Sequence, residues 1–139
     1  MTLFVLDTDH VSLLEKGNVQ ILKTIIAHSM DTIAITVITI EEQLEGWQRA
    51  LRQATQDIHR EQIYRRMAQT VESLSGRPIL PYTCVAMQHR LSLLRMRLNV
   101  GSNDLKISAI ALEFQATVVT RNKRDFGRIP RLPLADWSV

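Results

Sequence analysis

Leu3-Phe-Val-Leu-Asp7 is the segment that decides the fold: four apolar residues in a row stop abruptly at an aspartate. An apolar run this short and continuous is typical of a strand buried on both faces, as in a parallel sheet. In open parallel sheets, active sites lie just beyond the carboxyl ends of the strands. The segment therefore predicts a buried strand over residues 3–6 and a functional position at Asp7.

On either side of this strand pattern the chain alternates short β-rich segments with longer helical patterns. Further strands are expected at residues 32–36, 79–82, 117–120 and 132–134, where β-branched or apolar residues lie beside turn residues. Helices are expected at residues 10–16, 19–27, 38–53, 57–74, 83–98, 103–116 and 122–126, with Asp9 as the cap of the first and Ser102 or Asn103 as the cap of the sixth. This alternation predicts an α/β sandwich around a mostly parallel sheet.

The composition is that of an ordinary globular protein, with 45% hydrophobic and 22% charged residues. With 139 residues and no repeat or linker, we expect a single domain over residues 1–139. The one cysteine, Cys84, cannot form an internal disulfide, which favours a reducing, cytoplasmic environment. The N-terminal apolar run is too short for a signal peptide or a membrane anchor, so no membrane association is expected.

Charge is distributed unevenly although the net charge is only +3. Residues 1–48 hold seven acidic and two basic residues, a net charge of −5, whereas residues 49–97 hold three acidic and nine basic residues, a net charge of +6. An acidic and a basic segment in one small domain suggest a metal site beside a surface that binds a polyanion. The alternative is that the arginines only solvate helix faces, and the pattern leaves both interpretations open.

Acidic residues stand close to the ends of the predicted strands. Asp7 and Asp9 follow the first strand, Glu41 and Glu42 begin the helix after the second, and Asp104 and Asp125 precede and follow the strand at residues 117–120. Carboxylates that meet at one sheet edge raise each other's pKa and require a cation to offset their charge. Oxygen ligands without paired histidine or cysteine favour hard ions, so Mg²⁺ is the expected metal, with Mn²⁺ as the alternative.

Each of these carboxylates also has a purely structural interpretation. Asp7 is a suitable helix cap, and Glu42 ends a Thr-x-x-Glu capping-box pattern. Asp104 suits the first turn of a helix, and Asp125 has arginine neighbours for a surface ion pair. The residues alone do not distinguish Glu41 from Glu42, and only the joint placement of the carboxylates favours a functional site.

Other chemistries have less support. The sequence has no glycine-rich nucleotide-binding loop. The four histidines lack metal-ligand spacing and are interpreted as surface or packing residues (His10, His28, His59 and His89). Trp47 and Trp137 are interpreted as core or interface anchors rather than as base-stacking platforms.

Four sequence motifs resemble those of the PIN-domain nucleases and, within that family, the VapC-type toxins of bacterial toxin–antitoxin pairs. They are Phe4-Val-Leu-Asp-Thr-Asp9, Ile38-Thr-Ile-Glu-Glu-Gln-Leu-Glu-Gly46, Val100-Gly-Ser-Asn-Asp-Leu-Lys-Ile-Ser-Ala109 and Thr120-Arg-Asn-Lys-Arg-Asp-Phe126. Together they span nearly the whole chain in the family's order. In the family's second motif the glutamate lies four residues before a glycine, and that spacing selects Glu42 over Glu41.

The resemblance implies a PIN-like three-layer α/β/α sandwich with Mg²⁺-dependent endoribonuclease activity, a homodimer, and inhibition by a cognate antitoxin protein. It implies a catalytic set of Asp7, Glu42, Asp104 and Asp125. On this basis we expect Asp7 and Asp104 to be the principal metal ligands and Glu42 to position or deprotonate the attacking water. Asp125 would complete the outer shell of the ion or hold a second ion. Auxiliary roles in holding metal, water or phosphate are expected for Asp9, Thr120 and Asn122.

Arginines of the basic middle segment are the expected contacts to RNA phosphates, namely Arg49, Arg52, Arg65 and Arg66. The helix pair at residues 38–74 has a second interpretation as an antitoxin-docking or dimer surface, because its apolar positions can form a groove for a partner helix. Two alternative functions stay open: a structure-specific DNA nuclease, since the same metal chemistry cuts either polymer, and a non-catalytic PIN-like module that binds RNA or a partner protein. We expect the latter to lack an acidic position, and all four are present.

Overall fold

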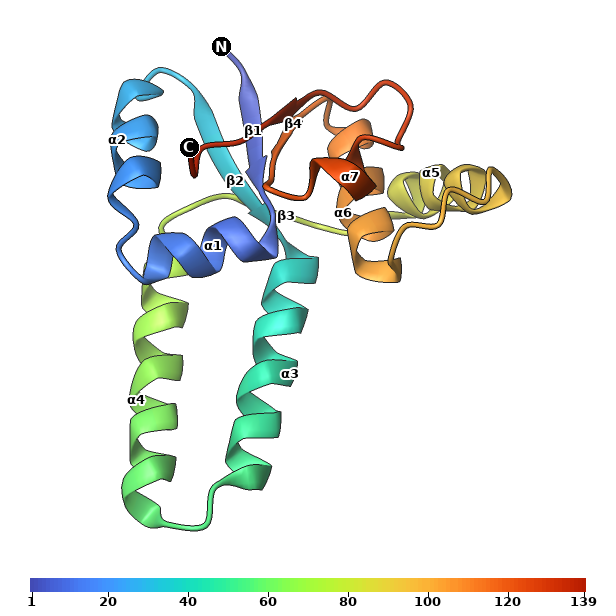
Figure 1. The fold of residues 1–139 in the computed structure, drawn as a ribbon. Helices are drawn as coiled ribbons and strands as arrows, with labels where there is room; N and C mark the ends of the chain where they lie inside the picture. The colour runs from blue at the N-terminus through green and yellow to red at the C-terminus, as the bar shows by residue number, and fades with distance from the viewer.

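Five parallel strands form the centre of the molecule, in the order β3-β2-β1-β4-β5 (Figure 1). The computed structural model describes residues 1–139. Its strands are β1 (Leu3–Leu6), β2 (Thr32–Thr36), β3 (Ile79–Leu80), β4 (Thr117–Val119) and β5 (Leu134–Ala135). Every neighbouring pair is parallel. The expected α/β fold is confirmed, and the sheet is parallel throughout rather than mostly parallel.

The strand β1 is central because it is apolar on both faces. Phe4 and Leu6 pack into one hydrophobic cluster with Val11 and Ile21, whereas Val5 packs into a second cluster on the other face of the sheet. Burying each such side chain contributes about 1.5–3 kcal/mol. The alternation fixes the register of β1, because a slip by one residue would exchange the two faces.

Helices cover both faces of the sheet, as a three-layer sandwich requires (Figure 1). They are α1 (Thr8–Glu15), α2 (Val19–Ala27), α3 (Val37–Gln53), α4 (Asp57–Leu74), α5 (Cys84–Arg95), α6 (Ser102–Glu113) and α7 (Lys123–Phe126). The cluster that holds Phe4 and Leu6 takes its helical residues mainly from α1 and α2, and the cluster that holds Val5 takes them mainly from α5 and α6. The three-layer arrangement is therefore confirmed.

The helices α3 and α4 form a long antiparallel hairpin that extends away from the sheet (Figure 1). Its buried residues, Ile38, Thr39 and Leu74, lie at the base of the hairpin, next to β2 and β3. Large apolar side chains farther along it are exposed, namely Leu44, Ile58, Tyr64 and Val71. No helix combines the length and the apolar character that crossing a membrane would need.

The expected cap of the first helix is wrong, and the alternative at Asp7 is confirmed. The Asp7 carboxylate accepts a hydrogen bond from the His10 backbone N–H at 2.8 Å, so α1 begins at Thr8. The expected capping box at Glu42 is also wrong, because Thr36 caps α3 by accepting from the Thr39 N–H. The strands β1 and β2 thus turn directly into helices, which leaves Glu42 free for other contacts.

Two later boundaries also differ from expectation. The helix α6 is preceded by Gly101, which offers no side-chain cap, so neither Ser102 nor Asn103 caps it. It ends at Glu113 rather than Ala116, because Gln115 adopts a positive φ of 55° that stops the helix. The last strand forms at Leu134–Ala135 rather than at 132–134 because Pro133, which has no N–H, contributes only its carbonyl, to the Val118 N–H.

Candidate active site

A polar hollow of about 590 Å³ lies beyond the carboxyl end of β1. Asp7 follows β1 directly, Glu42 comes from the second turn of α3, Asp104 from the first turn of α6, and Asn122 from the segment after β4. Its lining has no hydrophobic residue and comprises Asp7, Thr8, Asp9, Ser12, Glu42, Asp104, Arg121 and Asn122. The structure therefore brings three of the four expected carboxylates to one hollow.

Asp104 is the carboxylate that this crowding affects most. Burial, together with the negative charges of Asp7, Glu42 and Asp125, raises the pKa of Asp104 to about 6. A hydrogen bond from Asn122 lowers this pKa and so offsets part of the effect. Four carboxylates from separate parts of the chain thus share one electrostatic environment. Asp104 also lies in the first turn of α6, so the structural interpretation of its position holds as well.

Glu42 is held in place by the first residue of α1. The Thr8 hydroxyl donates to Glu42 Oε1 at 2.9 Å and lies 3.0 Å from the Thr39 hydroxyl. Glu42 Oε2 makes no hydrogen bond with the protein. Glu41 is exposed and does not line the hollow. Of the two neighbouring glutamates, only Glu42 therefore lines the hollow.

Asn122 links the fourth carboxylate to the others. Its side-chain amide donates to Asp125 Oδ2 at 3.1 Å and to Asp104 Oδ2 at 3.4 Å. The Asn122 backbone N–H in turn donates to the Thr120 hydroxyl at 2.8 Å, which fixes the turn after β4. Asp125 does not line the hollow itself, and its other contact is an ion pair with Arg128 at 3.7 Å.

Asp9 stands at the rim of the hollow in an ion pair. Both of its carboxylate oxygens accept from the Arg121 guanidinium, at 2.7 and 3.0 Å. Asp9 and Arg121 are both exposed, and the hydrogen bond that Arg121 donates to Asp9 is the main cause of a raised Arg121 pKa. Sequence reasoning did not predict a cation at this position, and the separation of the two partners by 112 positions in the chain explains why.

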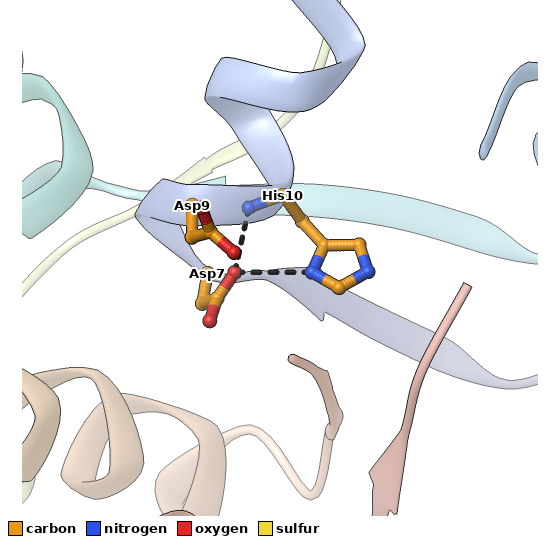
Figure 2. Close-up of side chains that lie close together, drawn as sticks. All are labelled: Asp7, Asp9 and His10. Atoms are coloured by element: carbon orange, nitrogen blue, oxygen red, sulfur yellow. Dashed lines mark hydrogen bonds and ion pairs between the residues drawn. The ribbon is translucent and has the colours of Figure 1, made fainter. Parts of the chain in front are cut away.

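His10 is a further site residue that the sequence interpretation missed. It is fully buried, and its Nδ1 lies 3.3 Å from Asp7 Oδ1. Figure 2 shows the His10 ring turned toward the Asp7 carboxylate. Its Nε2 accepts a hydrogen bond from the Trp137 backbone N–H at 3.3 Å, so the ring proton belongs on Nδ1, facing Asp7. The one available signal in the sequence was its position three residues after Asp7, on the same side of a helix.

The donor atoms of this cluster fit a divalent metal ion. Asp7, Asp9 and His10 each place one ligand atom within 4.8 Å of the others. His10 Nδ1 carries its proton toward Asp7 and orients that carboxylate, so the atoms left to bind an ion are the carboxylate oxygens of Asp7 and Asp9. A set dominated by carboxylate oxygen favours hard divalent ions, and the crowded charge around Asp104 gives such an ion a clear electrostatic role.

The four expected RNA-binding arginines lie on the hairpin and differ in their contacts. Arg49 and Arg52 are exposed on α3. Arg65 donates twice to Glu61 Oε1, at 2.8 and 3.0 Å. Arg66 lines a second hollow, between α1, α3 and α4, that adjoins the acidic one. Of the four, Arg66 is therefore the one placed beside the carboxylates.

The parallel sheet and the carboxylates gathered beyond its central strand define an α/β protein with a candidate nuclease site. The family model for the PIN domain matches residues 4–132, a range that contains all four carboxylates. The chain therefore belongs to the PIN-domain family, and the resemblance seen in its motifs is confirmed.

Proteins of toxin–antitoxin pairs are similar to this chain. DNA-bound VapBC from Salmonella typhimurium is 27% identical, with 99% of each chain covered and a TM-score of 0.79. VapBC-1 from nontypeable Haemophilus influenzae is 25% identical, with 99% of this chain and 100% of that chain covered and a TM-score of 0.75. Ribonuclease VapC2 from Rickettsia felis is 43% identical over 49 residues, which are 35% of this chain and 37% of that relative.

Proposed function

We propose that this protein is an endoribonuclease that depends on Mg²⁺, with Mn²⁺ as the alternative ion, and that it hydrolyses RNA phosphodiester bonds as the toxin of a toxin–antitoxin pair. The observation that carries the proposal is the convergence of Asp7, Glu42 and Asp125 on Asp104, whose pKa rises to about 6. Gathered carboxylates destabilise a fold unless a cation offsets them. The names of the relatives, a ribonuclease and VapBC complexes, support the reaction class.

Each carboxylate has a proposed role that follows from its contacts. Asp7 and Asp104 would hold the ion, directly or through water. A bound divalent ion supplies stabilisation of negative charge on the phosphodiester and activation of water. Glu42, with Oε1 occupied by the Thr8 hydroxyl, has Oε2 free to orient the attacking water and accept its proton. Asp125 would act in the outer shell through Asn122, or would hold a second ion.

Auxiliary and substrate-holding roles are also part of the proposal. Asp9 would hold water or metal when it is not paired with Arg121, and Thr120 would keep Asn122 in position. The arginines of the hairpin would hold RNA phosphates (Arg49, Arg52, Arg65 and Arg66).

Cleavage of a labelled RNA tests this function directly. Wild type should cleave with Mg²⁺ and not with EDTA, and Asp7→Asn or Asp104→Asn should lower the rate by at least about a hundredfold. Glu41→Gln is the matched control, because Glu41 neighbours Glu42 but is exposed outside the hollow. Undiminished cleavage by either folded aspartate variant would contradict the proposal. Preferential cleavage of a DNA of the same sequence would instead support the DNA-nuclease alternative.

An antitoxin protein is the proposed inhibitor. The cleft between α3 and α4 has a volume of about 180 Å³ and a lining of mainly apolar side chains, including Ile40, Leu44, Trp47, Val71 and Leu74. Such a cleft suits the apolar face of a partner helix. An antitoxin bound there should cover Leu44 and Val71. Hydrogen exchange of the backbone amides around these two residues should therefore be slower in the complex than in the free protein. Unchanged exchange across the hairpin would place the antitoxin elsewhere.

A homodimer is the proposed assembly. The helix α5 exposes apolar side chains that a second copy would cover, namely Val85, Leu91 and Leu94. Light scattering coupled to size-exclusion chromatography should give twice the 15.9 kDa chain mass. Leu91→Glu should convert the dimer to a monomer, whereas a monomeric wild type would contradict this assembly.

A further inference from the structure

A second polar hollow, of about 570 Å³, adjoins the acidic one. It lies between α1, α3 and α4, and the two hollows share Thr8, Ser12 and Glu42 in their linings. A polymer whose phosphodiester lies at the carboxylates therefore has a continuous path into this second hollow. The second hollow is therefore positioned to hold the nucleotide next to the scissile bond.

Two cations of this second hollow are available to an anion. Arg66 and Lys16 both line it, and neither forms an ion pair within the protein. Arg65, the preceding residue on α4, differs because Glu61 holds it at 2.8 Å. Burial raises the pKa of Glu15 in the same hollow, and a hydrogen bond from Gln43 and the charge of Arg66 only partly offset that effect. Arg66 and Lys16 can therefore bind a phosphate without first breaking an ion pair.

Trp47 gives the hollow an aromatic surface. It is the single hydrophobic residue among the 12 that line the hollow, and it is half-buried rather than fully packed. Amide and hydroxyl side chains line the same hollow, namely Gln43, Gln69, Thr70 and Ser73. An aromatic ring beside hydrogen-bonding groups is the combination that binds a nucleobase, by stacking on its face and pairing with its edge. Trp47 was expected to be a core or interface anchor rather than a base-stacking platform, and its half-buried position in this hollow favours the stacking role instead.

We propose that this second hollow is a subsite for one unstacked nucleotide of single-stranded RNA, next to the scissile phosphodiester. Trp47 stacks on the base, and Arg66 and Lys16 hold the adjoining phosphate. A base inside a duplex is paired and stacked, so it cannot enter. The proposal rests on the proposed endoribonuclease function and adds to it the residues that hold the nucleotide beside the scissile bond.

The test uses the full chain and a labelled single-stranded RNA whose cleavage site has been mapped with wild type. In a matched series, each nucleotide near that site is replaced by an abasic one. For wild type, one abasic position beside the scissile bond should lower kcat/KM roughly tenfold. Trp47→Leu should lower kcat/KM on the parent RNA by a similar factor. The kcat/KM of this variant should be the same on that abasic RNA as on the parent RNA. Trp47→Phe, which keeps an aromatic ring, should retain most of the wild-type rate.

Arg66 offers a second measurement that does not depend on folding of the tryptophan variants. Arg66→Gln should weaken RNA binding and reduce the slope of log affinity against log salt by about 0.7, the contribution of one phosphate contact to single-stranded nucleic acid. Arg65→Gln should have a smaller effect, because Glu61 already holds Arg65. Lys23→Gln, at an exposed residue of α2, is the control of equal charge and should leave the slope unchanged.

The outcomes separate this subsite from the proposed function. RNA cleavage by wild type without any coupling between Trp47 and an abasic position overturns the subsite and leaves the endoribonuclease in place. Failure of wild type to cleave RNA at all overturns both. If Trp47→Leu and Arg66→Gln cleave RNA normally but no longer bind the antitoxin, the hollow is a protein-docking site and the subsite is wrong.

Discussion

His10 Nδ1 lies 3.3 Å from Asp7 Oδ1, and the same carboxylate oxygen accepts the His10 backbone N–H at 2.8 Å. One residue therefore holds one oxygen of Asp7 from two directions and leaves Oδ2 free of both contacts. His10 Nε2 is fixed in turn by the Trp137 backbone N–H. The orientation of the first carboxylate of the site thus depends on the C-terminal segment of the chain.

Replacing His10 should weaken metal binding. His10→Ala removes the contact to Asp7 and leaves the buried Trp137 N–H without an acceptor, which costs about 1–3 kcal/mol of stability. We expect the affinity for Mn²⁺, measured by calorimetry, to fall about 10–100-fold. His10→Asn keeps an N–H group near the Nδ1 position and should recover part of that affinity. Equal affinities for wild type and His10→Ala would show that His10 only packs.

Removing the Thr8 hydroxyl should slow catalysis through Glu42. Thr8→Val keeps the shape of the side chain but removes the donor to Glu42 Oε1, so we expect kcat to fall about tenfold. Thr8→Ser keeps the donor and should be close to wild type. The informative comparison is made in a Glu42→Gln background, where Thr8→Val should add little. Full additivity of the two changes would rule out an effect through Glu42.

The stability of the metal-free protein should depend on pH through Asp104. Its pKa is about 6 in the folded protein and 3.8 ordinarily, so the protonated form is favoured on folding. The resulting stabilisation is complete below about pH 4 and is lost as the pH rises through 6. Asp104→Asn stays neutral at every pH. In EDTA at pH 7.5 it should therefore unfold at a higher temperature than wild type, and near pH 4 the difference should vanish.

The size of this difference follows from the shift and from the exposure of Asp104. One pKa unit corresponds to about 1.4 kcal/mol, and the solvent that reaches this half-buried group reduces the effect. We therefore expect a gain of about 1 kcal/mol, or about 3–5 °C in Tm. Glu41→Gln, at an exposed carboxylate that forms no ion pair, is the control. A gain for Asp104→Asn that persists unchanged at pH 4 would show that charge is not its cause.

Mg²⁺ should stabilise the folded protein through the same carboxylates. At a concentration 100 times the dissociation constant, a bound ion adds about 2.7 kcal/mol to the free energy of unfolding. Thermal unfolding of wild type should therefore shift upward with Mg²⁺, and Asp7→Asn and Asp104→Asn should lose most of the shift. The shift should also shrink below pH 6, because protons compete for Asp104. Glu41→Gln should respond as wild type does.

Much of the fold could be predicted from the sequence because the deciding signals are local. The bounds of β1, β2, α2 and α4 agree with the expected ranges, since apolar periodicity and turn residues act within a few positions of one another. The helix caps were harder to predict. Thr36, rather than the Thr39–Glu42 pair, caps α3, because the strand turns directly into the helix.

The sequence by itself determined the order of the helices and strands and the bounds of several of them, and its motif spacing predicted Glu42 rather than Glu41 as the site residue. Only the tertiary structure decided what these residues touch. Asp9 meets Arg121 from 112 residues away, and His10 meets Trp137 from 127 residues away. The physical reason is that a strand ending or a helix face follows from neighbouring residues, whereas a side-chain contact across the sheet follows from packing of the whole chain. Asp7 was evident from the sequence, but the histidine that holds it required the fold.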